Sequence, residues 1–316
     1  MSIDETGDSV ETINYQDRLN KEALSFNNIV SERSANNKIP DIRKNFFNPY
    51  FYNNIWRNGE FVRQHYGASV GWVVEQLRRA GVQSVVEFGC GDGWVCLELA
   101  RAGFKVLGID VSSDSISLAK QYLDELPEGK NLDLHYLCQN AIEFLKNSPN
   151  VDSVVCHGFL HHLPPAALDE FVTLVSAKMK SNNILVGVEP RYDKIRPQAT
   201  MLVYALRRAW PNHFHYNGSP ENEMKIIADE LGEAGKAQSE LDNESSSELI
   251  TQMVKNRFPQ VTLEYSNVFY DKVIGSLRVS HEDEIELSKL LSRLDDLIVK
   301  YSPEFGRRLQ FCAKRG

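Results

Sequence analysis

The chain has 316 residues, of which 42% are hydrophobic and 25% are charged, so it is long enough to bury the core of one elaborated soluble domain. Its formal net charge of -8 argues against a large, non-specific nucleic-acid surface. No apolar run approaches the length of a membrane span, and the beginning lacks an apolar signal segment. The five cysteines form no CxxC pair, so we expect reduced thiols and a cytoplasmic protein.

The first 80 residues change in composition near position 40. Residues 1–40 are polar, which predicts a partly flexible N-terminus with one helix within 14–31. Residues 41–80 are rich in aromatic side chains and are expected to form a helical cover, with Ser69 capping a helix over 70–80. Aromatic residues such as Tyr52 and Trp56 either pack a helix onto a sheet or face a bound ligand.

Residues 85–110, VVEFGCGDGWVCLELARAGFKVLGID, read as a strand, a glycine-rich turn, a helix and a second strand. The first apolar run is typical of a buried parallel strand. Glycines in the turn allow the backbone to approach a ligand closely. Asp110 closes the second strand, and the whole pattern is the first half of a doubly wound nucleotide-binding fold. The glycines are Gly89, Gly91 and Gly93.

The spacing ExGxGxG from Glu87 differs from the GxGxxG of dinucleotide-binding proteins. It resembles motif I of the class I S-adenosylmethionine-dependent methyltransferases. The resemblance implies that the loop holds the methionyl part of the cofactor and that Asp110 binds both ribose hydroxyls, for which a carboxylate is a suitable acceptor. A packed unit without a ligand is the alternative. The implied contacts in this stretch are Glu87, Gly89, Cys90, Gly91, Gly93, Asp110 and Val111.

A helix over 112–126 and a third strand over 132–137 follow, and the strand leads to Asn140 and Ala141. In the family that the chain resembles, an Asp or Asn followed by a small residue contacts the adenine at this place. The resemblance therefore implies that Asn140 accepts a hydrogen bond from the exocyclic amine and that Ala141 leaves space for the ring edge.

A fourth strand over 151–156 leads into HGFLHHLPP, which resembles the "hHHLP" segment of small-molecule methyltransferases. The resemblance implies that His157 borders the cofactor, that His161 lies near the acceptor and that His162 faces it. His162 then acts as a general base, orients the acceptor by a hydrogen bond or caps the next turn. We expect no metal, because no carboxylate or histidine stands at ligand spacing around the pair.

A helix over 166–180 and a fifth strand over 183–188 lead to Glu189. Glu189 is a second candidate for an acid or base, and Arg191 either pairs with an anionic acceptor or forms a surface pair with a glutamate. The acceptor-side residues implied by the resemblance are Tyr52, Trp56, His161, Arg191 and Tyr192.

The remaining chain divides into an insertion over 193–257 and a C-terminal part over 258–316. The insertion is expected to be a helical lid or a dimerisation element. The C-terminal part is expected to supply a sixth strand over 261–265, a helix over 281–301 and an antiparallel edge strand over 309–313. Together with the core over 81–192, this predicts an α/β fold with a doubly wound, Rossmann-like, seven-stranded sheet whose final strand is antiparallel.

The resemblance implies methyl transfer from S-adenosylmethionine, with S-adenosylhomocysteine as product, to an oxygen or nitrogen of a small metabolite, such as a natural-product or sugar-like intermediate. The (D/N)PP(Y/F) signature of enzymes that methylate amino groups of nucleic acids and proteins is missing after the fourth strand. We therefore expect a small-molecule partner, no membrane and no nucleic acid, and leave a homodimer open. The alternative function is a methyltransferase-like module that binds or regulates without turnover.

Overall fold

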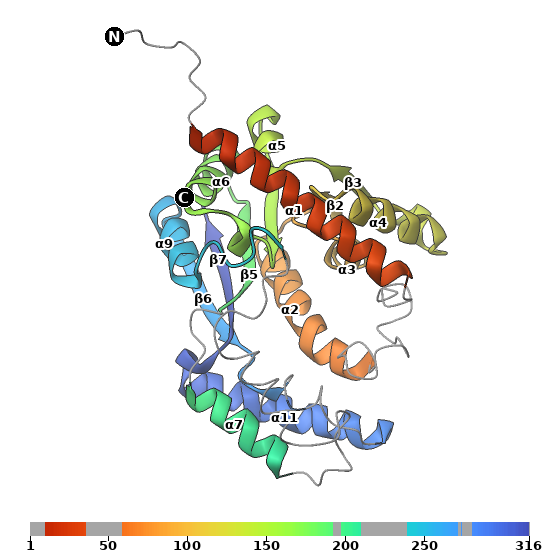
Figure 1. Cartoon of the computed structure of the whole chain (residues 1–316), viewed down its shortest axis with the longest axis vertical. Coiled ribbons are helices and arrows are strands. Elements are labelled where there is room, and N and C mark those ends of the chain that lie inside the picture. Colours follow the sequence, from red (N-terminus) through yellow and green to blue (C-terminus); the bar gives the residue numbers. More distant parts are fainter. Residues whose placement is uncertain are drawn as a thin grey trace.

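A twisted seven-stranded sheet forms the centre of the molecule, with strand order β3-β2-β1-β4-β5-β7-β6 (Figure 1). The computed structural model describes residues 10–35, 59–191, 197–209, 239–270, 273 and 280–315. Strands β1 to β5 pair with one another in parallel, and β7 runs antiparallel to both of its neighbours, β5 and β6. The strands are β1 (Ser84–Phe88), β2 (Lys105–Asp110), β3 (Leu134–Cys138), β4 (Ser153–His157), β5 (Ile184–Pro190), β6 (Gln260–Ser266) and β7 (Arg308–Lys314).

The predicted seven-stranded sheet with a final antiparallel strand is confirmed, but the place of that strand was predicted wrongly. We expected it at the edge, whereas β7 lies between β5 and β6. Its side chains from Leu309 to Ala313 are all buried, as suits an inner strand covered on both faces. β6 alternates between exposed and half-buried residues along QVTLEYS, which is the pattern of a strand at an edge.

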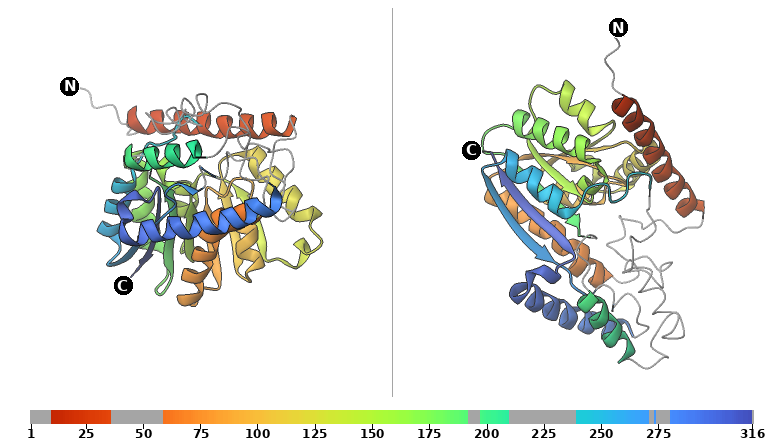
Figure 2. Two further views of the ribbon diagram at one scale, coloured as in Figure 1. Left: turned by 90° about the horizontal axis from the view of Figure 1, so that it is seen from below. Right: turned by 60° about the vertical axis from the view of Figure 1, so that its left-hand side comes forward.

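Helices cover both faces of the sheet (Figures 1 and 2). Helices α2, α3 and α4 pack on one face, where they bury residues such as Leu77 and Leu99 against Val155. Helices α5, α6 and α9 pack on the other, where Phe171 lies against Phe88 with ring centroids 5.2 Å apart. The bounds are α2 (Gly59–Arg79), α3 (Trp94–Arg101), α4 (Ser113–Glu125), α5 (Ala141–Asn147), α6 (Pro165–Lys178) and α9 (Ser247–Arg257).

Among the described residues, three further helices lie outside these two layers (Figure 2). α1 (Val10–Ala35) contacts α4 and is longer than the predicted 14–31. α11 (His281–Tyr301) has the predicted bounds, and both α11 and α7 (Pro197–Arg208) lie at the lower end of Figure 1. Short 3-10 turns are η2 (Gly129–Asn131), η3 (Leu160–His162) and η6 (Pro303–Phe305). In the part of the chain that the structure describes, no helix combines the length and apolarity needed to cross a bilayer.

Ser69 does not cap a helix as predicted, because α2 already begins at Gly59 and Ser69 lies within it. Its hydroxyl oxygen lies 3.0 Å from Nε2 of His157 at the end of β4. The residue therefore connects α2 to the carboxyl end of the sheet.

Candidate active site

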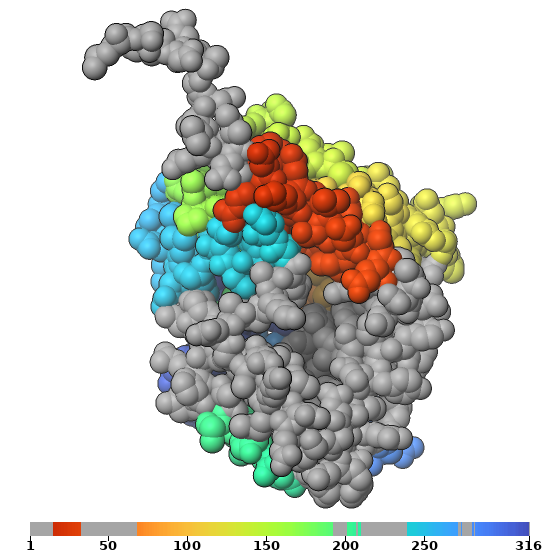
Figure 3. All heavy atoms as spheres, in the orientation of Figure 1, coloured from red at the N-terminus to blue at the C-terminus, as the bar shows by residue number. Residues whose placement is uncertain are grey.

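A cavity of about 520 Å³ opens at the carboxyl ends of β1, β2, β4 and β5. Ligands in open α/β sheets bind at this edge, and a cavity of this volume is in the usual range for small-molecule sites. One wall comes from α1 and another from Leu241 and Asp242. Figure 3 shows the atoms of α1, in red, next to those of the 239–257 segment, in cyan.

The glycine turn after β1 adopts conformations that require glycine. The φ angles of Gly89, Gly91 and Gly93 are 73°, 52° and 83°. A Cβ on Gly89 would stand 2.6 Å from Phe159, and one on Gly93 would overlap the Tyr136 hydroxyl. Nothing lies within 4 Å of the Cβ position of Gly91, so this backbone is open toward a ligand. Gly89 and Gly91 line the cavity, and Gly93 is buried beneath it.

Asp110 stands in the cavity wall with its carboxylate held by two backbone donors. The N–H of Gly91 donates to Oδ2 at 2.9 Å, and the N–H of Ser112 donates to Oδ1 at 2.8 Å. Burial raises the pKa of Asp110, and these backbone hydrogen bonds oppose that rise. Two fixed donors leave further lone pairs of the carboxylate available to a diol. Val111, which follows it, also lines the cavity.

Glu87 lies beneath the turn and not among the residues that line the cavity. Its Oε2 accepts a hydrogen bond from the Cys96 thiol at 2.8 Å. Burial raises the pKa of Glu87 to about 8, so the neutral acid is the favoured form at neutral pH. Cys90 is buried in the same layer. Neither of these two predicted cofactor residues is among those that line the cavity.

Asn140 and Ala141 both line the cavity. The predicted adenine acceptor, Asn140 Oδ1, already accepts a hydrogen bond from the Glu143 N–H at 3.0 Å and so caps α5. One lone pair of this oxygen is used in the cap, and a carbonyl oxygen has a second one for a ligand.

His157 lines the cavity as a neutral residue. Burial, aided by the charge of Arg308, lowers the pKa of His157 to about 4. Its ring packs edge-on against Trp94 with centroids 6.0 Å apart, and Nε2 faces Ser69. These contacts fix the ring against the cavity wall.

Glu189 holds the η3 turn, although it was predicted as an acid or base facing the acceptor. One carboxylate oxygen accepts the N–H groups of Phe159 at 3.0 Å and Leu160 at 2.8 Å. The other oxygen lies 2.7 Å from Nδ1 of His161. The residue is only 1% exposed. Its carboxylate is therefore engaged in positioning the histidine turn.

His162 is paired with Glu22, a residue that sequence analysis missed. Nδ1 of His162 lies 2.9 Å from Oε1 of Glu22. Burial alone would lower the pKa of His162, but the hydrogen bond and the charge of Glu22 outweigh it and raise the pKa. A helix was predicted within 14–31, and the signal that could have pointed to its role is the helical spacing of Tyr15, Leu19, Glu22 and Phe26, which line the cavity from one helix face.

Arg191 is buried, and its guanidinium contacts other residues of the same chain. Its Nη1 donates to the carbonyl oxygen of Gly306 at 2.6 Å, and its guanidinium lies 4.2 Å from the ring centroid of Tyr265. It lines the cavity and is buried, whereas one of the two predictions put it at the surface. The predicted acceptor residues Tyr52, Trp56 and Tyr192 lie outside the described residues.

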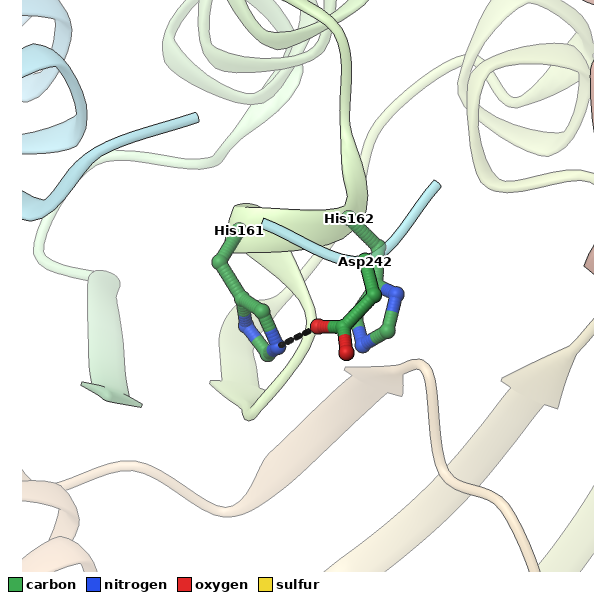
Figure 4. Close-up of side chains that lie close together, drawn as sticks. All are labelled: His161, His162 and Asp242. Atoms are coloured by element: carbon green, nitrogen blue, oxygen red, sulfur yellow. Dashed lines mark ion pairs between the residues drawn. The ribbon is translucent and has the colours of Figure 1, made fainter. Parts of the chain in front are cut away.

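The fold also brings Asp242 to the two adjacent histidines (Figure 4). One ligand atom from each of His161, His162 and Asp242 lies within 4.8 Å of the others. No metal was predicted here because the neighbouring sequence offers no carboxylate. Asp242 supplies one from a distant part of the chain.

A family model described as a methyltransferase domain matches residues 85–182, which include the glycine turn and the first four strands. The search of curated proteins gave no match. A solved SAM-dependent methyltransferase from Archaeoglobus fulgidus is 21% identical, covering 81% of this chain and 98% of its own, with a TM-score of 0.45. A plantazolicin methyltransferase in complex with SAH is 13% identical, covering 97% and 98%, with a TM-score of 0.47. Magnesium protoporphyrin IX methyltransferase from Synechocystis PCC 6803 with bound SAH is 14% identical, covering 80% and 85%, with a TM-score of 0.42.

Proposed function

We propose that this chain, whose residues 85–182 belong to the methyltransferase domain family, transfers a methyl group from S-adenosylmethionine to an oxygen or nitrogen of a small metabolite. The observation that carries the proposal is the Asp110 carboxylate, which backbone N–H groups hold in the cavity wall beside the open face of Gly91. An oriented carboxylate next to a close-approach turn fits a ligand with a vicinal diol and no pyrophosphate.

The described residues divide the binding of the cofactor between them. Gly89 and Gly91 would hold the methionyl part, Asp110 the ribose hydroxyls, and Asn140 with Ala141 the adenine. His157, which is neutral at pH 7, would border the sulfonium without repelling it. S-adenosylmethionine carries its own leaving group, so the chain mainly has to orient the acceptor and exclude water.

His162 is the candidate for proton transfer on the acceptor side. It lines the cavity, and Glu22 orients its ring and increases its basicity, as a carboxylate does for a histidine base. The remaining nitrogen, Nε2, would accept the proton of a hydroxyl acceptor as its oxygen attacks the methyl group. An amine acceptor needs only to reach its neutral form. Glu189 would serve this chemistry as a positioning residue through the η3 turn.

Calorimetry with S-adenosylhomocysteine tests the cofactor assignment. Wild-type protein should bind one molecule per chain, and Asp110→Ala should lose at least about tenfold in affinity, because a charged hydrogen-bond partner contributes about 1.5–3 kcal/mol. Asp133→Ala is the matched control, since it removes an exposed carboxylate near the start of β3. No binding by the wild type, or equal binding by Asp110→Ala, would contradict the assignment.

Transfer of labelled methyl groups to a small-metabolite extract then distinguishes an enzyme from a binding module. A labelled product of low mass is expected. His162→Ala should reduce turnover of a hydroxyl acceptor most strongly at the pH values where wild-type His162 is neutral. If the protein bound the cofactor but transferred no label to any fraction, the non-catalytic alternative would be supported. Unchanged turnover in His162→Ala protein would contradict the assignment of His162 as the general base.

A further inference from the structure

We propose that His161, His162 and Asp242 bind a divalent transition-metal ion beside the cofactor cavity. One ligand atom of each side chain lies within 4.8 Å of the other two, and one of these separations is close to that of shared ligation. Nε2 of His161 and Oδ1 of Asp242 are 3.7 Å apart, which is too long for a hydrogen bond. Two ligand atoms on one tetrahedral zinc ion, each about 2.0–2.1 Å from it, are separated by about 3.4 Å. Figure 4 shows the Asp242 carboxylate between the two imidazole rings.

The outer partners of both histidines match those of metal-binding imidazoles. Nδ1 of His161 lies 2.7 Å from Oε2 of Glu189, and Nδ1 of His162 lies 2.9 Å from Oε1 of Glu22. A histidine that binds a metal through one nitrogen usually donates its other N–H to a carboxylate, which fixes the tautomer and the orientation of the ring. Both rings therefore have Nδ1 engaged and Nε2 on the side of Asp242.

Charge favours a cation at this place. Glu22, Glu189 and Asp242 surround the two imidazoles with three carboxylates, and the side chains of Glu22 and Glu189 are 5% and 0% exposed. Burying such a group of acids is costly without compensating positive charge. Two imidazole nitrogens and one carboxylate oxygen suit borderline ions such as zinc, iron or cobalt better than magnesium or calcium, which prefer oxygen ligands.

The ligands reach one place because the fold joins two distant segments there. His161 and His162 belong to η3, which follows β4, and Asp242 belongs to the turn before α9. The N–H of Ser245 donates to the carbonyl oxygen of His161 at 3.1 Å, and the Ser245 hydroxyl donates to the carbonyl oxygen of Leu163 at 2.5 Å. These hydrogen bonds hold Asp242 against the histidine turn.

The metal site and the proposed proton transfer use the same nitrogen of His162. A bound ion and general-base action by His162 therefore exclude each other, and this consequence rests on the proposed function. Binding of the metal itself does not rest on it. Protein that binds S-adenosylhomocysteine but no metal would keep the proposed function and lose the metal site. Protein that binds metal but no S-adenosylhomocysteine would keep the metal site and lose the proposed function.

Calorimetric titration of the full chain with zinc, after removal of any affinity tag and dialysis against a chelator, tests the site. One zinc ion per chain is expected. Asp242→Asn should weaken zinc binding at least about tenfold, and Glu22→Gln should weaken it about 10–100-fold as a lost outer partner. His135→Gln, which changes an exposed histidine on β3, should bind zinc like the wild type. Cobalt in place of zinc should give a visible absorption spectrum that Asp242→Asn alters.

Two results would overturn the metal site. One is the absence of stoichiometric zinc binding by wild-type protein, which needs no variant to interpret. The other is wild-type zinc affinity in Asp242→Asn protein, provided that its far-ultraviolet circular dichroism matches that of the wild type. If Asp242→Asn protein does not fold, Glu22→Gln with unchanged zinc affinity and an unchanged cobalt spectrum would overturn it instead.

Discussion

Single residues in the turn after β1 are constrained in different ways. Gly89 and Gly93 combine a left-handed φ with a neighbour that fills the Cβ position, whereas Gly91 has only the unusual φ. Gly91 therefore leaves room for a ligand, while the other two allow Phe159 and Tyr136 to pack on the turn. The pattern GxGxG thus serves the packing of the protein as well as the approach of a ligand.

Gly93→Ala should destabilise the protein more than Gly81→Ala. Both positions have positive φ, which costs an alanine about 1–2 kcal/mol. A Cβ at Gly93 would in addition overlap the Tyr136 hydroxyl, and overpacking adds about 1–3 kcal/mol, whereas nothing lies within 4 Å at Gly81. Urea unfolding measures both free energies. Equal losses in the two variants would show that Tyr136 moves away without cost.

Buried Glu87 makes stability depend on pH. Burial raises its pKa from 4.5 to about 8, so between these values the folded chain binds more protons than the unfolded chain. The free energy of unfolding should therefore fall as the pH rises through this window. In Glu87→Gln protein this fall should be reduced, as measured by urea unfolding from pH 5 to pH 8. The control Glu286→Gln, at an exposed position, should keep the wild-type dependence of the unfolding free energy on pH. If Glu87→Gln protein also kept the wild-type dependence, Glu87 would be ionised in the folded state.

At the scale of elements, the histidine turn η3 depends on one carboxylate from the neighbouring strand. Glu189 at the end of β5 accepts three backbone N–H groups of the turn and contacts the His161 ring. Phe159 and Leu160 have no hydrogen-bonding side chain of their own to cap the turn. The position of the turn that carries both histidines, and the orientation of the His161 ring, thus depend on the pairing of β4 with β5.

Glu189→Gln should loosen this turn. An amide has one acceptor oxygen in place of two, so at least one N–H or the His161 ring loses its partner, at a cost of about 1–3 kcal/mol. Hydrogen exchange of the Phe159 and Leu160 amides should accelerate, and urea unfolding should show the loss. Glu264→Gln on exposed β6 is the control. Unchanged exchange in Glu189→Gln would mean that the turn holds its shape without this carboxylate.

Local sequence patterns predicted the strands and the helices α3, α4 and α6 well, because burial and periodicity are local properties. The seven strands and the position of Asp110 at a strand end follow from apolar runs and turn residues. The place of β7 between β5 and β6 does not follow from local patterns, because the order in which strands pair depends on contacts across the fold. The partners Glu22 and Asp242 were missed for the same reason. Both come from segments far from the histidines in the chain.

At the scale of the whole molecule, α1 connects two regions at the mouth of the cavity. Asn27 Oδ1 accepts hydrogen bonds from the Ser112 hydroxyl at 2.7 Å and the Asp114 N–H at 3.2 Å, which ties α1 to the start of α4. On its other side, Arg18 forms an ion pair with Glu244. The helix predicted as part of a flexible N-terminus therefore forms a wall of the site.

Glu22 should be the strongest link between α1 and residues 239–245. Its two oxygens accept hydrogen bonds from the Ser239 hydroxyl at 2.8 Å and the Leu241 N–H at 2.7 Å. In Glu22→Ala protein these donors lose a charged acceptor worth about 1.5–3 kcal/mol each, so amide exchange across 239–245 should accelerate about tenfold or more. Hydrogen exchange read by mass spectrometry measures the segment directly. Asp17→Ala, which removes an exposed acid from the same helix, should leave it unchanged. If the segment exchanged at the wild-type rate in Glu22→Ala protein, its position would depend on Ser245 and the histidine turn, and α1 would close the cavity without holding Asp242 in place.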